Sequence, residues 1–487
     1  MIIKKTNLLF ITLINVFSYN CFAQNNNNSI KANDALKSQT ATTIQSGYDA
    51  YKKIAFSIWD YAELGYKENK SSTLLQNTLK DNGFVVDAGV AGMPTAFVAT
   101  FGNGSPVVAI LAEYDALPGI SQDNSPTKTT IANKNSAHAC GHHLFGTGSV
   151  AAGTAIKKLL ETGKLKGTIK VFGCPAEEGG SGKVYMVREG LFNNVDIVLH
   201  WHASDNNSVM YTSALANKSA KFRFHGIASH ASMSPEQGRS ALDAVEAMDN
   251  MVNMMREHIP QETRIHYVIT NGGKAPNVVP EFAEVYYYVR HPDKTVAVSI
   301  FDRITKAAEG AALGTETKMD YEIIGGTHDL LINKTLAMNM QTNLEKVGGV
   351  TYTADEIIFG KKIQTSFLGK ATAIDSAAVV KDLHIEKNQG STDVGDVSYT
   401  VPTVGVETAT WVPGTSAHSW QAVASGGTDI GVKGMIVAAK TLAFTAIDLF
   451  TNPALIKEAK EEFIQTKGDY QYKALLGDRK PALNYRD

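Results

Sequence analysis

The stretch GTIKVFGCPAEEG, residues 167–179, joins a short apolar run to two adjacent acids. A run of this length that contains β-branched and aromatic residues predicts a buried strand over residues 167–174. The same order recurs in two other places, where apolar runs lead into Glu113-Tyr114-Asp115 and into His200-Trp201-His202. Each predicted strand therefore ends at side chains that can bind metal ions or transfer protons.

Predicted strands and helices alternate along the chain. Residues 48–80 have helical apolar spacing, and residues 144–160 have the periodicity and small residues of a well-packed helix. This alternation predicts an α/β fold with a mostly parallel sheet and helices on both faces. Open sheets of this kind bind ligands beyond the carboxyl ends of their strands. We therefore expect the polar residues after these strands to form one site.

The pattern changes between residues 214 and 327. Strand-type and helix-type segments there follow the order β-α-β-β-α-β, which predicts an inserted ferredoxin-like α+β module. The helix-strand pattern then returns and ends with a long helix near residues 431–450. We expect the catalytic domain to consist of residues 44–213 and 328–487, with the module as a separate domain. The chain has neither an internal repeat nor a phosphate-binding loop.

Composition restricts the class of protein. The chain has 487 residues, of which 44% are hydrophobic and 19% are charged, and its formal net charge is -2. This is a globular composition, and no apolar run after the N-terminus is long enough to span a bilayer. The near-neutral charge argues against a nucleic-acid partner, since such proteins carry a basic footprint.

The N-terminus has the features of an export signal. Lys4 and Lys5 precede an apolar stretch over residues 8–17, and small residues stand at the positions that a signal peptidase inspects before Ala23. We expect residues 1–23 to be removed and the protein to be exported, to a periplasm in a bacterium with two membranes. Acylation of Cys21 is the alternative, although the preceding Ser18-Tyr19-Asn20 lacks the usual small residue. The Asn-rich residues 24–43 predict a flexible leader.

Removal of the signal peptide leaves two cysteines, Cys140 and Cys174. In an oxidising compartment such a pair normally forms a disulfide. We expect both to stay unpaired here, because a disulfide would consume a thiolate that the metal cluster needs.

Metal-type side chains are concentrated in two short stretches, His138-Ala139-Cys140-Gly141-His142-His143 and Cys174-Pro175-Ala176-Glu177-Glu178-Gly179. Cys140 and His142 are two residues apart, and Gly141 lets the backbone aim both at one ion. Of the two acids, one can bind metal while the other takes a proton from a water molecule. His418 could supply a further ligand. His200 and His202 share one face of a strand, and the residues alone do not decide between them.

These motifs resemble the aminoacylase/carboxypeptidase family of di-metal metallopeptidases. The resemblance covers nearly all of the mature chain and is greatest for the branch that contains the B chain of p-aminobenzoyl-glutamate hydrolase and the indole-acetyl-amino-acid hydrolases. It implies that Cys140 bridges two divalent ions, zinc or manganese, and that Glu177 is the general base. It further implies the ligands His142, Glu178, His202 and His418. The family usually has Asp or Asn where this chain has His143.

The inserted module matches the same family. Gly226-Ile227-Ala228-Ser229-His230-Ala231 resembles the family's lid motif, whose histidine reaches across a homodimer to stabilise the oxyanion. Asn277 and Arg290 resemble the residues that hold the free carboxylate of the substrate, a role that suits the guanidinium fork. The resemblance thus implies a dimer through the inserted module.

The predicted activity is metal-assisted hydrolysis of an amide that releases a free amino acid. N-acyl amino acids, p-aminobenzoyl-glutamate and dipeptides all fit this chemistry. Two rivals are a cysteine hydrolase that uses Cys140 with His142, and a binding protein that keeps the fold without catalysis. The first leaves both glutamates without a role, and the second would be expected to have lost a ligand or Glu177.

Overall fold

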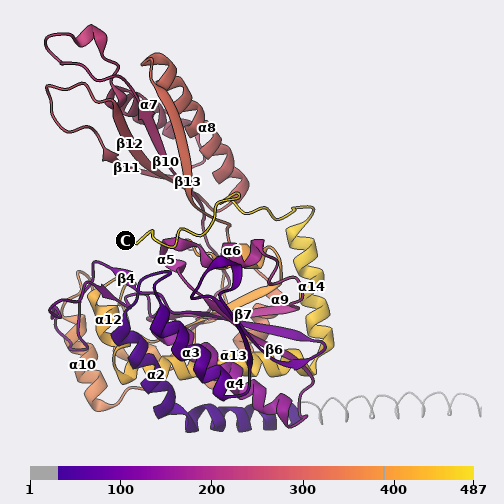
Figure 1. The fold of residues 1–487 in the computed structure, drawn as a ribbon. Coiled ribbons are helices and arrows are strands. Elements are labelled where there is room, and N and C mark those ends of the chain that lie inside the picture. The colour runs from indigo at the N-terminus through magenta and orange to yellow at the C-terminus, as the bar shows by residue number, and fades with distance from the viewer. Residues whose placement is uncertain (1–30, 388–389, 487) are drawn as a thin grey trace, which may run out of the picture.

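In a computed structural model the structure describes residues 31–387 and 390–486 (Figure 1). The predicted signal peptide and the start of the predicted leader, residues 1–30, lie outside these residues. The described chain forms two bodies, each with its own sheet and its own hydrophobic core.

The larger body is built on a seven-stranded sheet with the order β1-β2-β6-β3-β7-β15-β8. Its four central strands are parallel, and antiparallel pairs lie at both edges. The predicted α/β class with a mostly parallel sheet is confirmed. The strands are β1 Val85–Ala88, β2 Phe97–Asn103, β3 Val107–Glu113, β6 Gly167–Cys174, β7 Ile197–Ser204, β8 Ser208–Val209 and β15 Thr403–Ala409. Two-stranded ribbons are formed by β4 Leu117–Pro118 with β5 Ser136–Ala137 and by β9 Thr212–Ser213 with β14 Glu386–Lys387.

Helices lie on both sides of this sheet (Figure 1). Two long helices, α4 and α13, pack against each other and against the central strands. Both are buried over most of their length because small and apolar residues fill all their faces. The helices are α2 Tyr48–Tyr61, α3 Asn69–Asp81, α4 His142–Glu161, α5 Glu177–Gly180, α6 Gly182–Arg188, α9 Lys334–Val347, α10 Ala354–Gln364, α11 Val394–Ser398, α12 Trp420–Gly426, α13 Asp429–Thr451 and α14 Pro453–Lys467.

Among the described residues, α13 is long and apolar enough to cross a membrane. Its most apolar window is 89% buried within the protein, as expected for a core helix.

Part of the predicted leader is folded. Residues 31–46 are helical, and Lys37 is buried in a salt bridge with Asp448 of α13 at 2.7 Å. The prediction of a flexible leader is therefore wrong for residues 31–43. The asparagine-rich composition hid an amphipathic segment whose contacts are more than 300 residues away.

The smaller body is the module between the two parts of the chain that build the seven-stranded sheet. It comprises β10 Ala216–His225, α7 Ala241–Met255, β11 Arg264–Asn271, β12 Phe282–His291, α8 Lys294–Gly314 and β13 Lys318–Thr327. Its antiparallel sheet has the order β11-β12-β10-β13, which is the ferredoxin-like arrangement. The start of β10 and the ends of β12 and β13 lie nearest the larger body, so loops 226–240 and 272–281 lie at the far end (Figure 1).

Replacement of Lys37 by Met tests whether the helix at residues 31–46 stabilises the larger body. The change leaves Asp448, whose side chain is 16% exposed, without its cation. We expect the free energy of unfolding to fall by about 2 kcal/mol in urea titrations. Lys346→Met, which breaks the exposed pair with Asp34 of the same helix, is the matched control and should cost less than about 1 kcal/mol. Equal effects of the two changes would contradict a stabilising role for the buried pair.

Candidate metal centre

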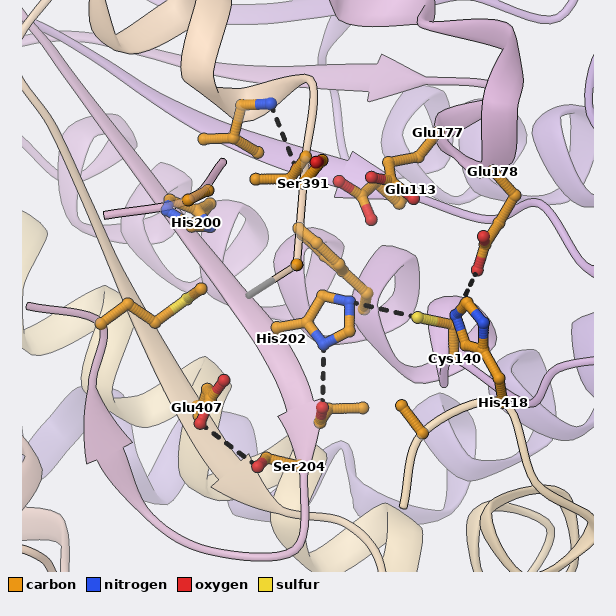
Figure 2. Close-up of a pocket in the computed structure, with 18 of the residues that line it drawn as sticks. Glu113, Cys140, Glu177, Glu178, His200, His202, Ser204, Ser391, Glu407 and His418 are labelled. Atoms are coloured by element: carbon orange, nitrogen blue, oxygen red, sulfur yellow. Dashed lines mark hydrogen bonds and ion pairs between the residues drawn. The ribbon is translucent and has the colours of Figure 1, made fainter. Parts of the chain in front are cut away.

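Four segments bring metal-type residues to the carboxyl-terminal edge of the parallel strands. Cys140 lies in the turn before α4, Glu177 and Glu178 follow β6, His202 lies within β7, and His418 follows β15. Gly141 makes the turn possible: its φ is 78°, and a Cβ there would lie 2.3 Å from the Cβ of Ala203. The predicted gathering of these residues at one edge is what the structure shows (Figure 2).

Cys140 is common to two groups of candidate ligands. The ligand atoms of Cys140, His142 and His202 lie within 4.8 Å of one another, and so do those of Cys140, Glu178 and His418. The Sγ of Cys140 lies 3.5 Å from Nε2 of His202, and Nε2 of His418 lies 3.2 Å from Oε1 of Glu178 (Figure 2). A thiolate at this position can contact an ion in each group.

The strand geometry distinguishes the two histidines that the sequence left open. His200 and His202 both belong to β7 and both line the cavity of about 370 Å³ at this site. Only His202 lies within ligand distance of Cys140 and His142 among the described groups. His200 lies against Gly405 of the neighbouring strand, where a Cβ would come within 2.3 Å of its ring. The geometry therefore favours His202 as a ligand.

Glu113 is a site residue that the sequence analysis placed only in a supporting role. Its Oε2 lies 3.1 Å from Nε2 of His142, and the ligand atoms of Glu113, His142 and Glu177 form a third candidate group. The other oxygen of Glu113 pairs with the fully buried Lys183 at 2.5 Å. Lys183 also pairs with Asp393 at 2.6 Å. The spacing of Glu113 and Asp115 after a strand was the available signal, but Lys183 carried none.

Asp115 links the two halves of the site. Its Oδ1 accepts a hydrogen bond from Nδ1 of His142 at 2.9 Å, and its Oδ2 accepts one from the backbone N–H of Glu178 at the same distance. A carboxylate on Nδ1 leaves Nε2 of His142 directed toward the cavity, as is usual for metal-binding histidines.

Burial and crowding of acids shift the pKa values at this edge. Burial, with the charges of Glu113 and Glu178, raises the pKa of Glu177 well above its usual range. Burial also raises the pKa of the Cys140 thiol. His142 has a raised pKa although burial opposes it, because Cys140, Asp115 and Glu113 surround it with negative charge. The site without ions is thus a concentration of negative charge that divalent cations would offset.

The donor atoms also fit metal ions in their hydrogen bonding. Several buried atoms that face the cavity have no hydrogen-bond partner: His142 Nε2, Glu113 Oε2 and Glu178 Oε1. Buried polar atoms are normally paired, so convergent unpaired donors of this kind indicate a missing ligand. Thiolate, imidazole and carboxylate together are the donors that bind zinc and neighbouring transition metals.

His143 has a structural environment. Its Nε2 is 3.0 Å from the carbonyl oxygen of Gly426, and its ring lies 5.0 Å from that of His138. Burial lowers the pKa of His143 to about 3, so the imidazole is neutral. His138 in turn contacts the carbonyl oxygen of Ile58. Both rings are buried and are absent from the three candidate ligand groups of the described chain.

The residues from the module separate into two sets. Arg290, at the end of β12, lines a second cavity of about 420 Å³ that also includes Glu177, Glu178 and His418. His230 and Asn277 lie in the far-end loops, where the N–H of Ala231 donates to the carbonyl of Asn277. Neither lines a cavity that contains the candidate ligands. A single chain therefore places Arg290 at the site but not His230 or Asn277.

Comparison with known proteins identifies relatives over most of the chain. Residues 109–421 match the family described as peptidase family M20/M25/M40. The chain is 40% identical to the B chain of p-aminobenzoyl-glutamate hydrolase from Escherichia coli, over 88% of this chain and 95% of that protein. It is 29% identical to the Xaa-Arg dipeptidase of Mus musculus, over 88% and 92%. A solved dinuclear metal-binding peptidase of the M20 family from Bacillus subtilis superposes with a TM-score of 0.57 at 17% identity, over 83% of this chain and 99% of that one.

The two free, buried cysteines provide a matched test of the ligand groups. Cys140→Ala removes the atom shared by two groups, so metal content after dialysis should fall by at least one ion per chain. Cys174→Ala should leave it unchanged, because Cys174 donates to the carbonyl of Phe172 within β6. Elemental analysis by mass spectrometry checks both. Unchanged metal content in the Cys140 variant would exclude the thiolate as a ligand.

Proposed function

The chain belongs to peptidase family M20/M25/M40, whose relatives here are hydrolases of amide bonds, and on that premise we propose that it is a di-metal amidohydrolase that releases a free amino acid. N-acyl amino acids of the p-aminobenzoyl-glutamate type are the proposed substrates. The observation that carries the proposal is the pair of ligand groups joined at Cys140, with Glu177 beside them.

Two ions would be held by Cys140 together with His142, His202, Glu178 and His418. Divalent ions bound there would acidify a water molecule and polarise the amide carbonyl. The soft thiolate and the imidazoles suit zinc, and manganese is the second candidate.

Glu177 is the proposed general base. Its carboxyl group lies between Glu113 and Glu178, and these acids with burial make it a ready proton acceptor. It takes a proton from the attacking water and later returns it to the nitrogen of the departing amine. Glu113 is held by Lys183 and does not need to perform this step.

His230 and Asn277 are proposed to act on the site of a second chain. They are exposed in the far-end loops of one chain, whereas the mechanism requires a hydrogen-bond donor for the oxyanion. A homodimer through the module would supply His230 from the partner, and Arg290 of the same chain would hold the carboxylate. Because the name of the Escherichia coli relative describes it as one of the subunits of its enzyme, assembly with a different chain is the alternative.

Dipeptides are the second candidate substrates, favoured by the similarity to the Xaa-Arg dipeptidase. Export after cleavage at Ala23 would place either activity outside the cytoplasm, where it would serve scavenging.

Glu177→Gln tests the mechanism. We expect kcat to fall by about 10³-fold or more on p-aminobenzoyl-glutamate, N-acetyl amino acids and dipeptides, because the amide cannot accept the proton. Metal content should stay at the wild-type level. Glu189→Gln, on an exposed side chain at the end of α6, is the control and should keep full activity. Activity that is blocked by thiol alkylation but survives chelators would instead support a cysteine hydrolase.

A mixing experiment tests the role of His230. Glu177→Gln and His230→Ala should each be nearly inactive alone. If His230 acts across a homodimer, each mixed dimer has one intact site, and unfolding and refolding the two variants together should restore about a quarter of the wild-type activity. No recovery in a sample that sedimentation shows to contain mixed dimers would place His230 outside the partner's site.

A further inference from the structure

The segment after α14, residues 468–486, connects the two bodies. In Figure 1 this yellow segment runs between the module and the seven-stranded sheet and reaches α5. On the module it contacts β13, where Arg479 donates to the carbonyl of Ile324. On the larger body its carbonyl groups at Gly477 and Arg479 accept hydrogen bonds from Arg188 of α6. We call residues 468–486 the strap.

The start of the strap is anchored in a buried polar cluster. The hydroxyl of Tyr470 lies 2.7 Å from Nε2 of His328, and that of Tyr472 donates to Asp396 at 2.9 Å. His328 and Asp396 are fully buried and pair at 2.8 Å. Ala474 and Leu476 of the strap belong to the core of the larger body. The strap is therefore an integral part of the fold.

The last described residues of the strap reach the proposed active site. Tyr485 donates from its hydroxyl to the carbonyl oxygen of Glu178 at 3.0 Å, and Nη2 of Arg486 donates to the same oxygen. Arg486 also stacks on Tyr485, with its guanidinium carbon 4.7 Å from the ring centroid. These contacts hold the guanidinium at the wall of the second cavity, which contains Arg290.

The second cavity is lined by polar atoms that have no partner in the protein. Six such buried atoms belong to its lining residues: Asn217 Oδ1, Ser219 Oγ, Arg290 Nε, Thr327 Oγ1, Ser391 Oγ and Arg486 Nε. Buried donors and acceptors in this number indicate a polar ligand rather than an apolar one.

The charges of this cavity indicate the sign of the ligand. Of its acids, Glu177 and Glu178 face the metal-type cluster, and Asp393 pairs with Lys183. Within the residues that the structure describes, neither Arg290 nor Arg486 forms an ion pair with a carboxylate. Two guanidinium groups with free N–H donors match two carboxylates.

We propose that Arg486 binds the side-chain carboxylate of an acidic leaving amino acid, while Arg290 binds its α-carboxylate. The inference rests on the proposed hydrolase function and narrows its substrate class to amides of glutamate or aspartate. The cavity adjoins Glu177 and His418, so a leaving amino acid held there has its amide nitrogen directed toward the proposed base.

The test compares p-aminobenzoyl-glutamate with p-aminobenzoyl-glutamine, which has the same shape but lacks the second charge. Metal-loaded wild type should prefer the glutamate substrate in kcat/KM. Arg486→Gln should lower kcat/KM for that substrate by about 10- to 100-fold and change the glutamine substrate less than about threefold. Lys480→Gln removes the same charge from an exposed position of the strap and should keep the wild-type preference.

Two further variants separate charge from anchoring of the strap. Arg486→Lys keeps a cation and should retain part of the preference, whereas Tyr485→Phe removes a hydrogen bond to Glu178 and should retain all of it. Loss of preference in Tyr485→Phe equal to that in Arg486→Gln would overturn the assignment. So would an equal loss of both substrates in Arg486→Gln.

A binding measurement keeps the inference independent of turnover. Calorimetric titration of the metal-loaded Glu177→Gln variant with free glutamate and free glutamine should show tighter binding of glutamate. Adding Arg486→Gln should weaken glutamate binding by about tenfold or more and leave glutamine binding unchanged. If wild type hydrolyses no amide but this difference holds, only the proposed function fails. If wild type hydrolyses amides and binds the two amino acids equally, only the role of Arg486 fails.

Discussion

Burial of acids at one edge of the parallel sheet is the constraint on which the site depends. Glu113, Asp115 and Asp393 are all buried, and Glu177 and Glu178 lie beside them. Uncompensated charge in such a place is strongly unfavourable. Lys183 neutralises part of it through its two ion pairs, and His142 is held between Asp115 and Glu113. What Lys183 and His142 leave uncompensated is the electrostatic reason that divalent cations suit this site.

The same constraint explains the division of labour among the acids. Asp115 is fixed by hydrogen bonds from His142 and from the backbone of Glu178, so it orients two ligand candidates at once. Glu113 is fixed by Lys183. Glu177 is the acid without a lysine partner and is the one whose pKa burial raises most clearly among them. An acid in that environment is suited to moving protons, and fixed acids are suited to holding ligands in place.

The second cavity ties the site to the rest of the molecule. Its walls come from β10, β12 and β13 of the module, from α5 and from the strap. The amino acid product would thus be recognised where the two bodies meet, and the strap joins these bodies by contacts to β13 and α6. In this arrangement, recognition of the substrate depends on the relative position of the two bodies, which gives the module a role even within one chain.

The sequence by itself determined the α/β class, the ferredoxin-like order of the module and the residue types of the metal-type cluster. These depend on apolar periodicity and on motifs within a few residues, such as Cys140-Gly141-His142, and such signals are local. Only the tertiary structure decided that His202 rather than His200 faces Cys140, that His143 packs against His138, and that Lys183 neutralises Glu113. It alone brought Arg486 beside Glu178 and folded residues 31–46 onto α13. Each of these outcomes depends on a partner that is distant in the sequence or on the direction of a side chain, and neither is encoded in a short stretch of residues.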